Sequence, residues 1–306
     1  MEHLVHWDDV EPRRREESHI AGSWRDLGTA VGSVGAGVTR IDIDPGRWST
    51  AAHTELVEEE IFFVLGGSGI SWQDGEIFEV AKGDCLVHLA AEEAHTLKAG
   101  PDGLDVLAFG LRVYPTGTLL PRAGIVWMGP ALVDATTDPR HPWKREAAAG
   151  EPEVGTMSER PRRIVNFADA DFLEVRACVD RDLGRSAGSE RTGLCHVTVA
   201  PGKKGAPHHC HSAEEEIFVI LDGGGTLYLG EEEHPVRAGH VLGRPPGTGV
   251  AHSFRAGNEG MTYLAYGTRE PNDIAYYPDS NKVNFRGIRL IGRIERLDYW
   301  EGEPED

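Results

Sequence analysis

The sequence predicts an all-β protein built from two copies of one unit. Three observations support this prediction. Short apolar runs alternate with clusters of Gly, Pro and Asp, no long segment repeats its apolar residues with the helical period of 3.6, and one half of the chain can be laid over the other. Many short strands with turn signals at regular spacing are typical of a β-sandwich or a closed barrel.

An internal repeat relates the two halves by a constant offset that brings Glu58 onto Glu214. One extra residue in the second copy lengthens this offset by one for the later matches. Chance does not produce so many coincidences at one offset. The matched stretches are 25–28 with 181–184, Pro45-Gly46 with Pro201-Gly202, 58–62 with 214–218, Gly83 with Gly239, His95 with His252, and Gly110 with Gly267.

The repeat divides the chain into an N-terminal unit, residues 1–150, and a C-terminal unit, residues 161–306, with a linker at 151–160. The composition of residues 147–153, rich in Ala, Glu, Pro and Gly, is typical of such a linker. With 306 residues and 40% hydrophobic content, the chain is long enough to give each unit its own core.

Two apolar runs, 61–65 and 217–221, follow the acidic triplets of the two copies and do not alternate with polar residues. In an antiparallel sheet this pattern indicates that both faces are covered. One face would cover the interior of the unit, and the other needs a neighbour, either the second unit or another subunit. We therefore expect tightly packed barrels and a homodimer.

The charge excludes some partners. The chain has 31 basic and 50 acidic residues and a formal net charge of −19, which argues against a nucleic-acid surface, because phosphate contacts need clustered Lys and Arg. No stretch approaches the roughly 20 apolar residues that cross a bilayer, and the polar, acidic start of the chain is unlike a secretory signal. We expect a cytoplasmic protein with four reduced cysteines and no membrane partner.

The stretch 207–216, PHHCHSAEEE, carries the most concentrated chemistry of the chain. In a β-strand His209 and His211 would point to the same face, and two imidazoles aimed at one point make half of a metal site. Glu216 lies an odd number of residues further on, so it reaches that point only if the chain turns near Ser212 and Ala213. Taken alone, the stretch could also be a histidine-rich solvent edge.

Together with a later segment, this stretch resembles the cupin superfamily, whose members fold as jelly-roll (double-stranded β-helix) barrels. The first cupin motif is matched by His209, His211, Glu216 and Gly223. The second, glycine, five residues, P-x-G and a histidine, is matched by Gly239, Pro245, Gly247 and His252, although four residues rather than two precede the histidine. The resemblance implies two tandem cupin barrels, a bicupin, with a divalent metal held in the C-terminal barrel by His209, His211, Glu216 and His252.

The N-terminal copy departs from the cupin pattern at one ligand position. The equivalent residues are His53, Glu55, Glu60 and His95, so Glu55 stands where the motif has its second histidine. Two histidines and two carboxylates form a harder ligand set that favours Mn or Fe. The alternative is a degenerate barrel kept for packing. We therefore expect one or two divalent transition metals, Fe or Mn first, with Ni, Cu, Zn and Co as alternatives.

Four protein ligands leave up to two open positions on a six-coordinate Fe or Mn ion, enough for a bidentate substrate or for a substrate and dioxygen. With the resemblance, this favours a metal-dependent oxidoreductase of the dioxygenase type that acts on a small carboxylate or phenolic compound. A metal-dependent isomerase or lyase for a sugar or oxo-acid would use the same residues. A non-catalytic barrel that binds a small molecule is a third interpretation.

No residue of the sequence can be assigned as a general base, and the catalytic residues other than the metal ligands stay unknown. The chain has no GxSxG elbow, no GxxxxGK[ST] loop and no GxGxxG opening a helix. Side chains near the motifs that could line the pocket are His208, Tyr228, Arg244, Phe254 and Tyr263.

The C-terminal tail carries the segments YYPDSNK at 276–282, Arg286-Gly287 and DYWEGE at 298–303. It resembles the tail of a group of functionally uncharacterised cupins. We expect this tail to strap across the barrel or onto a partner.

Overall fold

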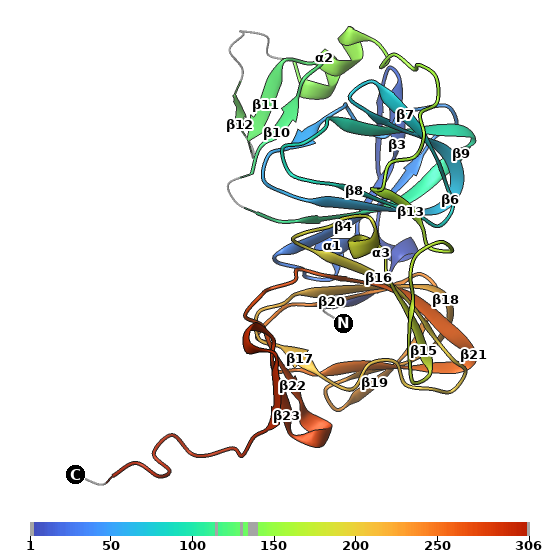
Figure 1. Cartoon of the computed structure of the whole chain (residues 1–306). Coiled ribbons are helices and arrows are strands. Elements are labelled where there is room, and N and C mark those ends of the chain that lie inside the picture. Colours follow the sequence, from blue (N-terminus) through green and yellow to red (C-terminus); the bar gives the residue numbers. More distant parts are fainter. Residues whose placement is uncertain (1–2, 114–115, 129–130, 134–139, 305–306) are drawn as a thin grey trace.

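The computed structural model describes residues 3–113, 116–128, 131–133 and 140–304, of which 131–133 are described by their backbone alone. Figure 1 shows two β-barrels, one above the other, the N-terminal barrel in blue to green and the C-terminal barrel in yellow to red. The fold is all-β, as predicted. The described helices are short: α1 (Leu27–Ala30), α2 (Pro142–Ala149), α3 (Leu183–Ser186), and the 3₁₀ turns η1 (Trp7–Asp9), η2 (Pro278–Ser280) and η3 (Arg286–Ile288).

Each barrel contains one large antiparallel sheet, and the two sheets have the same strand order. The N-terminal sheet runs β13 (Ile164–Asn166), β8 (Asp84–His88), β6 (Glu60–Gln73), β9 (His95–Leu111), β4 (Ala36–Ile43), β3 (Ile20–Asp26) and β2 (Arg13–Glu17), with β7 (Glu76–Ala81) beside β6. The C-terminal sheet runs β1 (Leu4–His6), β20 (His240–Arg244), β18 (Glu216–Leu229), β21 (His252–Gly267), β16 (Gly193–Val199), β15 (Cys178–Asp182) and β14 (Leu173–Val175), with β19 (Glu232–Arg237) beside β18.

A smaller sheet of four strands accompanies each large one. In the N-terminal barrel it consists of β12 (Ala131–Val133), β11 (Ile125–Met128), β10 (Thr118–Leu120) and β5 (Thr54–Glu55). In the C-terminal barrel it consists of β17 (Cys210–His211), β22 (Ile274–Tyr277), β23 (Lys282–Phe285) and β24 (Leu290–Arg293). The first part of the tail thus belongs to the barrel, whereas beyond β24 the chain leads away from it in Figure 1 and does not strap across it. Contact of the tail with a partner stays a prediction.

Two long strands form the frame of each barrel. In the C-terminal barrel β18 and β21 pair along almost their whole length, with shifts of register at bulges around Ile220–Gly225. The bulges bend β18, so that its first half pairs with β20 and its second half with β19. Gly223 has a φ of +65°, and a Cβ atom there would overlap the carbonyl oxygen of Gly260. Only glycine fits this corner, which explains the glycine of the first motif.

The two halves exchange one strand each. β1, at the start of the chain, pairs with β20 of the C-terminal sheet, and β13, after the linker, pairs with β8 of the N-terminal sheet. Each arm therefore completes the sheet of the other half. The expected domain boundaries at residues 150 and 161 describe the sequence repeat and stay a prediction. Two strands, β1 and β13, belong to the sheet of the other half.

The apolar runs after the acidic triplets contribute to two cores at once. Ile61 and Phe63 lie in a cluster shared by the two barrels, whereas Phe62 and Val64 lie in the core of the N-terminal barrel. In the second copy, residues 217 and 219 belong to the shared cluster and residues 218 and 220 to the C-terminal core. Period-two alternation thus places successive side chains in different cores.

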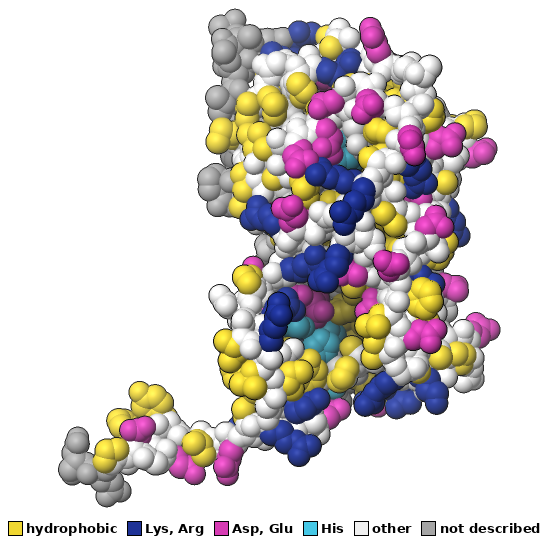
Figure 2. Space-filling model, viewed as in Figure 1, with side chains coloured by type: hydrophobic (Ala, Val, Ile, Leu, Met, Phe, Trp, Pro, Cys, Tyr) yellow, Lys and Arg dark blue, Asp and Glu magenta, His cyan; other side chains and the backbone are white. Residues whose placement is uncertain are grey.

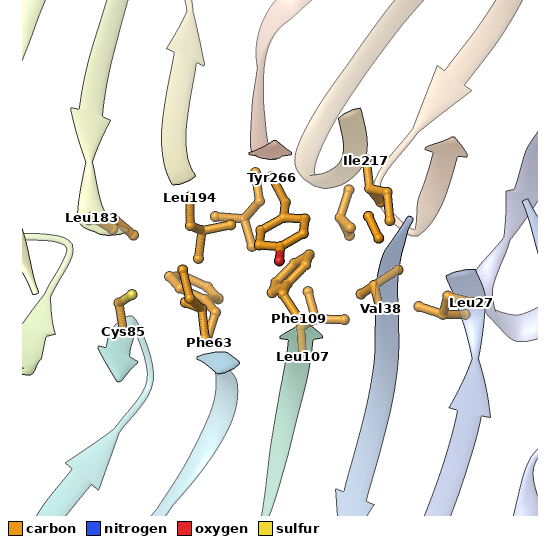
Figure 3. Packing of buried hydrophobic residues seen from close by; sticks show 14 of the residues in the cluster. Leu27, Val38, Phe63, Cys85, Leu107, Phe109, Leu183, Leu194, Ile217 and Tyr266 are labelled. Carbon is orange, nitrogen blue, oxygen red and sulfur yellow. The ribbon is translucent and has the colours of Figure 1, made fainter. Parts of the chain in front are cut away.

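The shared cluster is the interface between the barrels. In Figure 3 side chains of both halves meet there, with the ring of Phe109 stacked on that of Tyr266 at 5.1 Å between centroids. This confirms that the second face of these strands is covered, and the neighbour that covers it is the other barrel. A homodimer stays a prediction.

Candidate metal centres

The stretch that carries His209 and His211 lies beside two other segments. His209 forms a bridge with His252, whose N–H donates to the carbonyl of residue 209 at 2.8 Å. His211 belongs to β17, which pairs with β22. The chain then bends at Ser212 and Ala213, as the sequence requires for Glu216 to reach the histidines, and enters β18 at Glu216.

Three imidazoles converge on one carboxylate oxygen in the C-terminal barrel. Oε2 of Glu216 lies 3.2 Å from Nε2 of His252, 3.3 Å from Nε2 of His211 and 3.9 Å from Nε2 of His209. The Nδ1 of His209 lies 2.7 Å from the carbonyl oxygen of Pro207, which can only accept, so this imidazole carries its proton on Nδ1 and leaves Nε2 free. The structure thus brings together the four predicted residues of this barrel.

Burial and mutual charge set the protonation of this group. Burial opposes the charge of Glu216, but His252, His211 and His209 together lower its pKa to about 2. Burial and the neighbouring His252 lower the pKa of His209 to about 4. His211 behaves in the opposite way, because a hydrogen bond with Asp273 and the charge of Glu216 outweigh burial and raise its pKa.

The N-terminal barrel holds a similar but different group, which we name the N-terminal group: His53, Glu55, Glu60 and His95. Oε2 of Glu60 lies 3.0 Å from Nε2 of His95 and 3.4 Å from Nε2 of His53. Oε1 of Glu55 is more distant, 3.9 Å from Nε2 of His53, and both its carboxylate oxygens accept from Oγ1 of Thr118 at 3.0 Å. The structure therefore also brings these four predicted residues together.

The N-terminal group is partly neutralised by an internal ion pair. Burial opposes the charge of His53, yet Glu60 and Glu55 raise its pKa to about 9. Burial and the charge of Glu60 raise the pKa of Glu55 to about 7. Burial and the neighbouring His88 lower the pKa of His95 to about 4. At neutral pH a protonated His53 therefore faces an ionised Glu60.

The cross-strand partner of the central glutamate differs between the barrels. Arg244 on β20 is opposite Glu216, and His88 on β8 is opposite Glu60, so each points to the same face as its glutamate. Arg244 is 5% exposed, and its Nε is buried without a partner among the described residues. The ring of His88 stacks on His95 at 3.7 Å. The sequence interpretation missed His88, although the repeat aligns it with Arg244.

The other side chains expected near the pocket lie elsewhere. Phe254 and Tyr263 pack in the core of the C-terminal barrel, where both rings contact Phe218. The ring of Tyr228 lies under the ammonium of Lys204. His208 contacts Asp279 rather than Glu216. Of the five candidates, Arg244 alone is shown beside the metal group.

Comparisons with known proteins agree with the fold. Residues 195–266 match the family model described as the cupin domain. Auxin-binding protein 1 of Arabidopsis thaliana is 36% identical over 108 residues, which are 30% of this chain and 52% of that protein. The match thus spans about half the length of this curated relative.

Solved structures resemble most of the chain. Oxalate decarboxylase from Bacillus subtilis at pH 4.6 aligns with a TM-score of 0.60 and 15% identity, over 87% of this chain and 76% of that one. The formate complex of oxalate decarboxylase from Lactobacillus farciminis aligns with a TM-score of 0.60 and 15% identity, over 87% and 86%. The chain has the two-barrel fold of the bicupins. The bicupin prediction is thereby confirmed, whereas the resemblance of the tail to uncharacterised cupins stays a prediction.

The C-terminal site of this bicupin is open to the surface. Figure 2 shows histidine and acidic side chains at the bottom of a hollow in the C-terminal barrel. A cleft of about 420 Å³ includes Glu216 in its lining. Its charged lining residues are Asp182, Arg185, Glu214, Glu216, Arg269 and Arg286. Among the described residues, no helix is long and apolar enough to span a membrane.

The bicupin motifs do not include Asp273, whose carboxylate contacts a predicted ligand. Asp273 is 1% exposed, and its Oδ2 lies 2.6 Å from Nδ1 of His211. Burial opposes its charge, but hydrogen bonds from His211, Ala213 and Glu214 hold the pKa of Asp273 well below its usual range. Asp273 lies 62 residues after His211, and its only sequence signal is that it precedes the YYP segment.

Proposed function

We propose that this bicupin is a divalent-metal-dependent enzyme that acts on a small carboxylate in its C-terminal barrel. The observation that carries the proposal is the convergence of three imidazole Nε2 atoms on one carboxylate oxygen of Glu216. The metal ligands in this proposal are the four predicted residues His209, His211, Glu216 and His252.

The geometry of the group fits one cation. Two ligand atoms bound at about 2.1 Å and at right angles lie about 3.0 Å apart. The distances from Glu216 Oε2 to His252 and His211, 3.2 and 3.3 Å, are close to this value. These three ligand atoms are buried and have no hydrogen-bond partner in the described part of the chain. A bound cation would satisfy all three.

The donor set supports Mn(II) or Fe(II) as the metal. Imidazole and carboxylate ligands together suit both ions. A solved structure with the same fold, 15% identical, is that of Bacillus subtilis oxalate decarboxylase, for which Mn(II) centres are described. When bound, such an ion supplies a Lewis acid and one-electron chemistry.

The N-terminal group supports weaker metal binding. Nε2 of His53 carries a proton at neutral pH because Glu60 and Glu55 raise its pKa to about 9, so a metal must displace this proton before it binds. In the C-terminal group the pKa values of His209, His252 and Glu216 are lowered, and only that of His211 is raised. We therefore propose one tightly held ion per chain in the C-terminal barrel and a weaker site at His53, Glu55, Glu60 and His95.

Arg244 supports an anionic substrate. Its guanidinium lies near enough to Glu216 and His252 for the charges to interact, and one of its nitrogens is held by Thr248 and the carbonyl of Val250. The Nε–H is left without a partner among the described residues, inside the barrel. In this proposal Nε donates to a carboxylate oxygen of the substrate and orients it beside the metal group.

Two reactions fit this site. The dioxygenase reaction uses the open positions for a substrate and dioxygen, and it is the one that we propose. The second candidate is a lyase reaction that releases carbon dioxide, which is favoured by the likeness in fold to oxalate decarboxylases. Both reactions need a small carboxylate held beside the metal.

A metal and gas balance tests the proposal. Metal-free protein is loaded with Fe(II) or Mn(II), and bound metal, net oxygen uptake and carbon dioxide release are measured with gentisate-like acids and dicarboxylates. Stoichiometric metal with net oxygen uptake is the expected result. Carbon dioxide release without net oxygen uptake would support the lyase, and no stoichiometric metal would leave a non-catalytic binding barrel.

Ligand and pocket variants sharpen the test. His211→Ala and His252→Ala should each lose the tightly held ion, and normal metal content in His211→Ala would contradict the ligand assignment. Glu55→Ala should change total metal by one ion at most.

Arg244→Gln should keep the metal but raise KM for the carboxylate about 30-fold, since a hydrogen bond to a charged group contributes about 2 kcal/mol. The exposed Arg255→Gln is the matched control.

A further inference from the structure

The segment 273–279, which contains the start of the tail segment YYPDSNK, lies along the histidine-bearing stretch 207–216. β22 pairs antiparallel with β17, with Ala275 opposite His211 and Tyr276 opposite Cys210. β17 is the edge strand of its sheet and has β22 as its neighbour there. The position of the predicted ligands therefore depends on a segment about 60 residues further along the chain.

Three side chains of this segment contact three histidines of the stretch. Asp273 contacts His211. The ring of Tyr277 stacks on that of His209 at 5.7 Å and 20°. Asp279 lies 3.2 Å from Nδ1 of the third histidine, residue 208, which is not a predicted ligand.

We propose that Asp273 is the positioning residue of the C-terminal metal group, a role that rests on the proposed metal function. Its ionised carboxylate can only accept, so the proton of His211 lies on Nδ1 and the lone pair of Nε2 points to the metal side, 3.3 Å from Glu216 Oε2. This hydrogen bond selects the tautomer that can bind a metal through Nε2.

The second oxygen of Asp273 holds the bend that brings Glu216 to the histidines. Oδ1 accepts from the backbone N–H groups of Ala213 and Glu214 at 2.9 and 3.1 Å and from the hydroxyl of Ser212 at 3.3 Å. One carboxylate therefore orients a ligand and fixes the bend next to it.

The N-terminal barrel has an equivalent hydrogen bond in which the donor and the acceptor are exchanged. Its equivalent ligand position holds Glu55, a carboxylate that accepts, and here the neighbouring strand β10 supplies the hydroxyl donor Thr118 directly opposite. A histidine thus meets an acceptor and a carboxylate meets a donor. In each barrel, therefore, the residue at this ligand position has the kind of hydrogen-bond partner that its side chain requires.

The test compares Asp273→Asn with wild type. The asparagine oxygen can still accept from Ala213 and Glu214, while its NH₂ group faces Nδ1 of His211 and favours the tautomer protonated at Nε2. Metal-free protein is titrated with Co(II), followed by its visible absorption. The affinity of the tight site should fall 10- to 100-fold and its spectrum should change, while the melting temperature of the metal-free protein stays within a few degrees.

The controls separate positioning from folding. Asp279→Asn makes the same chemical change beside His208 and should leave the Co(II) affinity unchanged. Asp273→Ala removes the bend contacts too and should also lower the melting temperature of the metal-free protein. An unchanged affinity in Asp273→Asn, or an equal loss in Asp279→Asn, overturns the proposal. Absence of tight Co(II) binding in wild type would instead refute the metal function on which it rests.

A measurement on the unaltered protein keeps the proposal testable if Asp273→Asn does not fold. With ¹⁵N-labelled histidine and bound Zn(II), the Nδ1 of His211 should be protonated and its Nε2 should carry the metal. His211→Gln identifies the signal by its loss. A metal on Nδ1 of His211, or a proton on its Nε2, would overturn the proposal.

Discussion

At Glu216 a buried carboxylate is kept ionised by the imidazoles that surround it. Burial alone would raise its pKa, and the neighbouring histidines reverse this effect and lower the pKa to about 2. The same environment keeps His209 neutral, with a pKa of about 4. The metal-free group therefore offers a carboxylate and, at His209 and His252, imidazoles whose pKa is lowered, which favours the protonation states that a divalent cation requires.

These shifts predict that the metal-free protein is most stable near pH 6.5. His209, with a pKa of about 4 in the folded state and about 6.5 when unfolded, takes up a proton preferentially on unfolding between these values, so stability falls as the pH is lowered. His53, with a pKa of about 9, loses its proton preferentially on unfolding between about 6.5 and 9, so stability falls as the pH rises.

The measurement is the melting temperature of chelator-treated protein from pH 4 to 9. His209→Gln should make the acid limb less steep, since His95, with a pKa of about 4, still contributes to it, and should leave the alkaline limb. His53→Gln should instead reduce the slope of the alkaline limb. A melting temperature that rises steadily from pH 6.5 to 9 in the unaltered protein would show that the pair of His53 and Glu60 does not form.

At the scale of elements, a glycine lies under each exchanged arm. Gly239 has a φ of +93°, its carbonyl accepts from the N–H of Trp7, and a Cβ there would overlap the ring of His6. Gly83 has a φ of +89°, its carbonyl accepts from the N–H of Phe167, and a Cβ there would overlap that ring. The repeat aligns these two glycines. The packing of an exchanged arm against each of them explains why both positions hold glycine.

Gly83→Ala and Gly239→Ala should each destabilise the protein more than an ordinary substitution at positive φ. Backbone strain alone costs about 1–3 kcal/mol, and displacement of the arm adds to it. Urea denaturation measures the total, and limited proteolysis of the arms shows their release. Gly75→Ala is the matched control, since Gly75 has a φ of +97° with no atom within 4 Å of a Cβ. Equal losses in all three variants would contradict the role of the arms.

At the scale of the whole molecule, one buried glutamate of each barrel accepts hydrogen bonds from the backbone of the other barrel. Glu59 of the N-terminal half accepts from the backbone N–H groups of residues 190, 191 and 192. Glu215 of the C-terminal half accepts from the N–H groups of residues 34, 35 and 36, which the repeat matches to 190–192. Both glutamates immediately precede the central glutamate of their own barrel, so the interface and the two metal groups share a strand start.

Glu59→Gln and Glu215→Gln should each destabilise the chain by about 2–4 kcal/mol, because an amide NH₂ then faces buried N–H donors. The losses should add in the double variant, since the two glutamates share no partner. Urea denaturation should show one transition with an unchanged slope, and the exposed Glu76→Gln should have little effect. Two separate transitions in wild type would contradict the view that the barrels unfold together.

The sequence by itself determined the all-β class and the two copies, and its resemblance to the cupin superfamily supplied the ligand candidates. These features depend on local pattern: short apolar runs, turn residues and the spacing within PHHCHSAEEE are encoded by neighbours in the chain. The repeat extended this information to the N-terminal group, including the change to Glu55. It could also have paired His88 with Arg244, because the offset that aligns the triplets aligns these residues.

Only the tertiary structure decided which distant residues complete the site and what covers the strands. Asp273 and Thr118 reach their partners through pairing of β22 with β17 and of β10 with β5, and no local spacing encodes such contacts. The exchange of β1 and β13 and the shared core likewise depend on how the two halves pack. The physical reason is that periodicity says which face of a strand is apolar, whereas packing decides which surface covers that face.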